Sequence, residues 1–184
     1  MRPLVIILAL AIANAQAIAQ DLKHWDRTDA PEWKDFRGSV PERPLHDAYT
    51  AYRILANYAV NEERAVTWTV DCAFDRDRSW AKPAVRGSAV LLQHERLHFD
   101  IAEVHARSLR EKLAAGAVPA DERAQQALKA VLDSTMAQCR RDQDRYDKES
   151  DHGRDTVAGA RWDADVRARL SALAHLARRS RAGR

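Results

Sequence analysis

Two histidines and a glutamate in the stretch LLQHERLHFD (residues 91–100) have the types and spacing that bind and use a metal ion. On a helix with roughly 100° per residue, His94 and His98 point about 40° apart and one turn apart, so both imidazoles can reach one ion. Zinc suits such a site because three protein ligands leave a fourth position for water, which loses a proton near neutral pH. Glu95 is placed to accept that proton. The pattern predicts a catalytic zinc site with His94 and His98 as ligands and Glu95 as general base.

A third protein ligand has to come from outside this segment. On a straight helix Asp100 and Glu103 point away from the histidine pair, and His105 lies about 10 Å beyond it along the axis. Glu103 instead precedes Arg107 by four residues, so we expect these two side chains to form an ion pair.

A second helix, joined to the first by a short connection, should return antiparallel and bring residues 140–148 beside the histidine pair. His152 follows directly, and Gly153 permits a turn there. We expect His152 to be the third ligand, with Asp147 or Asp151 as the alternatives. His152 could otherwise be a loop or helix-capping residue.

Hydrophobic periodicity predicts the elements that hold these residues. Residues 48–60 and 64–74 alternate with a period of two, and the polar NEER segment between them is short enough for an antiparallel hairpin. Helical spacing follows in three segments: residues 88–115, about 119–146 and about 155–177. Residues 21–47, rich in Trp and Pro, read as an irregular strap over the core. The expected fold is α+β: a small antiparallel sheet packed on a long HExxH helix followed by two further helices, as in a minimal zincin-like metalloprotease.

The 184 residues fit one domain, expected over residues 20–177. Residues 1–19 contain an early arginine, an apolar run and small residues, which is typical of a cleaved signal peptide. No later segment has the roughly 20 apolar residues of a transmembrane helix, so no stable membrane anchor is expected. The formal net charge of +3 is too small to imply nucleic acid. Residues 178–184 read as a basic solvated tail.

Two cysteines, Cys72 and Cys139, remain in the oxidising compartment that a signal peptide implies. An even count there favours a disulfide between them over two buried free thiols.

The block HERLHFDIAE, the segment YDKESDHG and the later helix ARWDADVRARL resemble the bacterial domain-of-unknown-function family 922, described as predicted secreted zinc-dependent proteases. The resemblance covers nearly all of the mature chain. It implies metal ligation by the two histidines, catalysis by the glutamate between them, and a recurring segment at Tyr146, Asp147, His152 and Gly153. Ser150 stands where the family pattern has threonine, which keeps the hydroxyl.

The expected function is that of a secreted or periplasmic peptidase that acts on peptide or protein substrates with Zn²⁺ held by His94, His98 and His152. Glu95 would be the general base, and Tyr146 could stabilise the developing oxyanion unless it is a core tyrosine. The alternative is a secreted, zinc-stabilised envelope or binding protein that retains the metal site without turnover.

Overall fold

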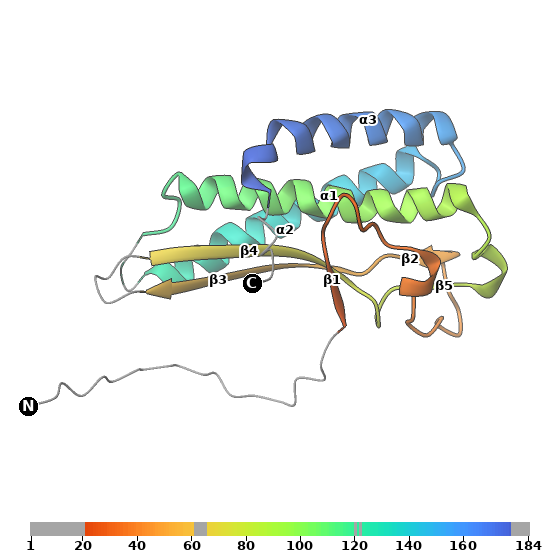
Figure 1. Cartoon of the computed structure of the whole chain (residues 1–184), viewed down its shortest axis with the longest axis horizontal. Coiled ribbons are helices and arrows are strands. Elements are labelled where there is room, and N and C mark those ends of the chain that lie inside the picture. The colour runs from red at the N-terminus through yellow and green to blue at the C-terminus, as the bar shows by residue number, and fades with distance from the viewer. Residues whose placement is uncertain (1–20, 61–65, 120, 122, 178–184) are drawn as a thin grey trace, which may run out of the picture.

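In the computed structural model, residues 21–60, 66–119, 121 and 123–177 are described. The predicted signal peptide, the NEER connection and the basic tail lie outside these residues. The described chain has an α+β architecture that combines a small antiparallel sheet with three helices (Figure 1). Among the described residues, no helix has the length and apolar character of a segment that crosses a bilayer.

The main sheet is built on the predicted hairpin. Strands β3 (Tyr52–Val60) and β4 (Val66–Asp75) pair antiparallel, with Ile54 opposite Cys72. The short strand β1 (Leu22–His24) pairs with the other edge of β4, so the sheet order is β1-β4-β3. The strap was predicted to be irregular throughout, and β1 is the part of that prediction that is wrong.

A second, two-stranded sheet lies beside the start of the long helix. Strand β2 (Ala48–Tyr49) pairs antiparallel with β5 (Trp80–Ala81). Two short 3-10 helices, η1 (Trp33–Asp35) and η2 (Pro83–Val85), lie in the connections. This arrangement places Thr50, which follows β2, against Glu95 of the long helix.

Helix α1 (Ala89–Ala114) begins where predicted, because the Ser88 side chain caps it by accepting a hydrogen bond from the Leu91 N–H. It ends next to Gly116, whose φ of +80° is readily adopted only by glycine. The helix contacts both long strands, β3 and β4, and also α2 and α3. It is therefore the central element of the molecule.

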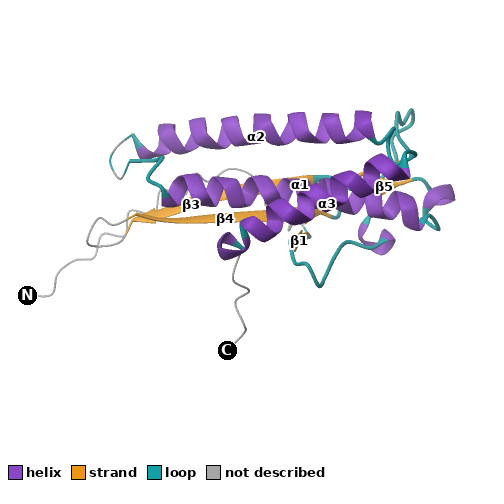
Figure 2. Cartoon of the chain, turned by 90° about the horizontal axis from the view of Figure 1, so that it is seen from above, coloured by secondary structure: helices purple, strands orange, loops and turns teal. Residues whose placement is uncertain are grey.

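Helix α2 (Ala124–Glu149) returns antiparallel to α1, as predicted, and runs alongside it in the view from above (Figure 2). Contacts along its length establish the register: Lys112 Nζ donates to Thr135, His105 pairs with Asp142, and His98 meets Asp147. Helix α3 (Thr156–Ala172) follows with Asp155 as its cap, and a 3-10 turn, η3 (Ala174–Leu176), ends the described chain.

The core has two parts separated by α1. The larger part lies between α1, α2 and the sheet and includes Phe36, Phe74 and Phe99. The smaller part lies between α1, the end of α2 and α3 and is built around Tyr146 and Trp162. The histidine pair lies beside this smaller cluster, at the end of the helical hairpin.

Candidate metal centre

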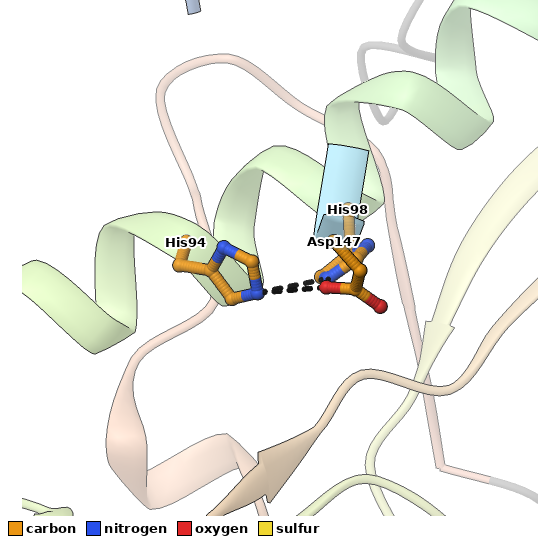
Figure 3. Close-up of side chains that lie close together, drawn as sticks. All are labelled: His94, His98 and Asp147. Carbon is orange, nitrogen blue, oxygen red and sulfur yellow. Dashed lines mark hydrogen bonds and ion pairs between the residues drawn. The ribbon is translucent and has the colours of Figure 1, made fainter. Parts of the chain in front are cut away.

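Three side chains from the two hairpin helices converge on one point (Figure 3). The Nε2 atoms of His94 and His98 lie 3.1 Å apart, and each lies 3.1 Å from Oδ1 of Asp147. Ligand atoms around a tetrahedral zinc ion stand about 3.3 Å apart when each bond is about 2.0–2.1 Å. Two imidazoles and one carboxylate also form a donor set that suits zinc. The three side chains therefore fit a metal ion and, among the described residues, form the group that could hold one.

The electrostatics of the group agree with a site for a cation. Burial raises the pKa of the Asp147 carboxyl, but its contacts with His94 and His98 outweigh burial and hold that pKa well below its ordinary value. Burial lowers the pKa of His98, while the hydrogen bond with Asp147 and the charge of Glu95 raise it more, so the net shift is upward. The surroundings therefore favour positive charge between these side chains.

Gln143 fixes the orientation of His98. Its Nε2 donates to the His98 carbonyl oxygen at 2.9 Å, and its Oε1 accepts from His98 Nδ1 at 2.5 Å. Because an amide oxygen can only accept, Nδ1 of His98 carries a proton in this hydrogen bond, and Nε2 is the ring nitrogen that faces Asp147 and His94. Such outer partners commonly orient histidine ligands of metals.

His94 is held by packing. Its ring stacks on Tyr146 with centroids 4.7 Å apart, and the backbone of Gly153 lies against it. A Cβ at position 153 would lie 3.0 Å from the His94 Cβ and Cγ atoms, closer than ordinary contacts allow. Glycine is thus required there both for space and for its φ of +84°.

Glu95 is buried beside the histidine pair and is held from the opposite side by Thr50, which follows β2. The Thr50 hydroxyl lies 2.7 Å from Glu95 Oε2, to which it donates, and 3.1 Å from the Glu95 carbonyl oxygen. Oε1 takes no part in these hydrogen bonds. Glu95 also lines the same cavity as the metal-binding group.

That cavity has a volume of about 590 Å³ and opens between the β2 region, the start of α1 and the end of α2. His94, His98, Asp147 and Glu95 all contribute to its wall. A cavity of this size, with a few convergent polar groups, is typical of a ligand or substrate site.

The other predicted site residues lie around this group. His152 Nδ1 is 3.6 Å from Asp147 Oδ1, and its ring lies 5.1 Å from that of His46; the side chain is half-exposed and lines the cavity. His152 is thus adjacent to the three-residue group without belonging to it. Asp151, the second alternative, is exposed and pairs with Arg154. Tyr146 is buried behind the imidazoles and is not among the residues that line the cavity.

Three exclusions made from helix geometry are confirmed. Asp100 accepts a hydrogen bond from Trp25 Nε1, and burial raises its pKa to about 6. Glu103 forms the expected ion pair with Arg107 at 2.9 Å, and both side chains are buried. His105 lies beside Asp142, further along the hairpin.

The predicted disulfide is not formed in the structure. Cys72 and Cys139 are both buried free thiols, and burial raises the pKa of each. Cys139 Sγ instead donates to the Tyr52 hydroxyl at 3.4 Å and accepts from Gln143 Nε2 at 3.8 Å. The count of cysteines in the sequence carried no information about these competing partners.

Two residues of the site were not identified from the sequence. Gln143 lies four residues before Asp147 and so shares its helix face, a spacing that could have pointed to it. Thr50 meets Glu95 across 45 residues of chain, and no local pattern indicates that contact.

The fold and the site together define an α+β protein whose helical hairpin brings two histidines and an aspartate into a group able to hold a metal ion. Over residues 28–153 the chain matches the family model described as "Bacterial protein of unknown function (DUF922)", and it belongs to this family. No curated protein and no solved structure matches the chain. The family resemblance is therefore confirmed over residues 28–153, a range that ends before the later helix ARWDADVRARL. The proteolytic activity that the resemblance implied stays a prediction.

Proposed function

We propose that this protein is a zinc-dependent peptidase whose metal ligands are His94, His98 and Asp147 and whose general base is Glu95. The observation that carries the proposal is the convergence of these four side chains on one cavity. Zinc bound there would supply a Lewis acid that makes water nucleophilic at neutral pH and polarises a carbonyl group. The predicted signal peptide adds the proposal that the enzyme acts in the periplasm or outside the cell.

Glu95 has the position and the hydrogen bonding that proton transfer needs. Because Thr50 donates to Oε2, the carboxylate is held in one orientation with Oε1 available to take a proton from the attacking water. The water oxygen bonds to the peptide carbonyl carbon, and the same proton passes from Glu95 to the departing amine nitrogen as the C–N bond breaks. Tyr146 orients His94 in this proposal, since it packs against that ring behind the cavity.

A peptide substrate is favoured by the free edge of β2. Among the described residues β2 pairs with β5 alone, and the cavity lies along Ala48, Tyr49 and Thr50 but not along the two β5 residues. The unpaired edge of a short strand can bind an extended peptide through backbone hydrogen bonds. A substrate bound in this way would pass directly in front of Glu95.

The first test replaces Glu95 with glutamine and compares it with Glu111→Gln, an exposed position on the same helix. We expect Glu95→Gln to keep stoichiometric zinc and to lose peptide hydrolysis by about 10²–10⁴-fold, because a general base typically contributes that factor. Glu111→Gln should match wild type. Zinc content and hydrolysis of quenched fluorescent peptides are the measurements. Equal activity of Glu95→Gln and wild type would reject the mechanism, and zinc binding without hydrolysis by wild type would support the non-catalytic alternative.

The second test separates the two candidates for the third ligand. Asp147→Ala should weaken zinc binding strongly, because Asp147 lies 3.1 Å from both imidazole nitrogens. His152→Ala should leave zinc affinity close to that of wild type. Competition with a chromophoric zinc chelator measures both, and the opposite ranking would assign the ligand to His152.

A further inference from the structure

Three exposed apolar side chains border the metal-site cavity. Leu45 is 93% exposed, Val90 53% and Tyr49 50%, and all three line the cavity. They are three of the five large hydrophobic residues that are exposed in the described part of the chain. Scattered apolar side chains on a surface need no explanation, but a group around one concave site marks a binding surface. We call these three residues the apolar rim.

Each rim residue is held by a different element. Leu45 lies just before β2, where the Asp47 carbonyl oxygen accepts from the Lys82 N–H at 2.9 Å and the Asp47 carboxylate pairs with Lys82 Nζ at 2.8 Å. Tyr49 is in β2 and stacks on Trp80. Val90 is in the first turn of α1. The exposure of the rim therefore results from anchored backbone around β2 and at the start of α1.

The opposite side of the cavity is polar. Arg140 and Asp144 from α2, and Arg154 from the turn after it, line that side. An apolar group that enters the cavity would therefore meet the apolar rim only on the side of β2 and α1. The cavity thus offers one apolar surface next to one group of catalytic side chains.

We propose that the apolar rim is a subsite for an apolar side chain of the substrate, next to the bond that is cut. This inference rests on the proposed function for the position of that bond. An extended peptide along β2 presents alternate side chains to opposite faces, so one of them can reach the rim while the neighbouring carbonyl faces Glu95. The substrate class is then peptides with leucine or a similar side chain at this position, and burial of such a side chain favours them over polar isosteres by about tenfold or more.

The test uses two small metal-chelating probes, acetyl-leucine hydroxamate and acetyl-asparagine hydroxamate, with zinc-loaded protein. The two side chains have nearly the same shape and no charge, so they differ mainly in polarity. Isothermal titration calorimetry should show the leucine probe binding about tenfold or more tightly. Equal affinities, or no binding of either probe, would overturn the proposal.

Variants with side chains of nearly the same shape show which residues produce the preference for the leucine probe. Leu45→Asn and Val90→Thr should each reduce it several-fold, while Val157→Thr, at an exposed valine on α3 outside the cavity, should leave it unchanged. Thermal unfolding and zinc content should match wild type in all three variants, because the side chains are exposed. A preference that survives in Leu45→Asn combined with Val90→Thr would overturn the assignment. Since hydroxamate binding needs no turnover, a leucine preference without peptide hydrolysis would uphold the rim and reject only the peptidase function.

Discussion

Two side-chain hydrogen bonds of Gln143 go to a single residue, His98. Replacement by leucine removes the acceptor that holds the His98 proton on Nδ1, and we expect zinc affinity to fall by about 10–100-fold, as for other outer partners of metal ligands. Gln138→Leu is the matched control, because Gln138 is exposed on the same helix. Chelator competition measures both variants. Equal zinc affinity of Gln143→Leu and wild type would show that His98 needs no such partner.

For single residues, the sequence predicted those members of the candidate site that lie together on α1. Spacing alone identified His94 and His98, and helix direction excluded Asp100 from ligation, as its hydrogen bond with Trp25 confirms. The identity of the third residue in the candidate metal group depends on how α1 and α2 align. The sequence indicates that alignment only to within a turn or two. Asp147 and His152 both fall inside that margin, so the choice between them needed the structure.

The turn between α2 and α3 brings the backbone of Gly153 against His94. Asp151, His152 and Gly153 have φ values of +46°, +52° and +84°, so three consecutive residues adopt the left-handed region. This conformation is unfavourable in free energy for Asp151 and His152, but not for glycine. The turn is stabilised because the His152 N–H donates to the Asp147 carbonyl oxygen and the Asp155 N–H to that of Ser150.

Three glycine substitutions separate the roles of this turn. Gly153→Ala should lower the free energy of unfolding by about 1–3 kcal/mol and also weaken zinc binding, because the new Cβ meets the His94 ring. Gly116→Ala has a positive φ but open space around it, so it should lower stability and leave zinc affinity unchanged. Gly87→Ala, with neither constraint, should change little. Urea denaturation and chelator competition provide the two readouts, and wild-type zinc affinity in Gly153→Ala would contradict the proposed contact.

Elements with strong periodicity were predicted well, and those formed by long-range pairing were not. The hairpin of β3 and β4 and the start of α1 at Ser88 follow from local pattern and capping. β1 has only three residues and exists because it pairs with β4, far along the chain. Helix α2 begins at Ala124, several residues after the predicted start at about residue 119.

At the scale of the whole molecule, α1 joins the sheet and α3 through a buried charge network. Glu103 Oε1 accepts from Arg107 Nε and from Arg110 Nη1, both at 2.9 Å. Arg107 also donates to the Leu170 carbonyl oxygen near the end of α3, and Arg110 to the Val70 carbonyl oxygen in β4. One carboxylate therefore pairs with two arginines that bind the backbone of two different elements.

Glu103→Gln should destabilise the protein by about 3 kcal/mol or more, because it leaves two buried guanidinium groups without a compensating charge. The matched control is Asp133→Asn, which breaks an i,i+4 ion pair with Lys129 on the exposed face of α2 and should change stability little. Urea denaturation of the two variants compares the loss of an i,i+4 ion pair in a buried and in an exposed environment. If both variants lose the same small amount of stability, the Glu103 network does not hold α3 and the sheet on α1. A large loss in Glu103→Gln alone would show that this network joins the three elements.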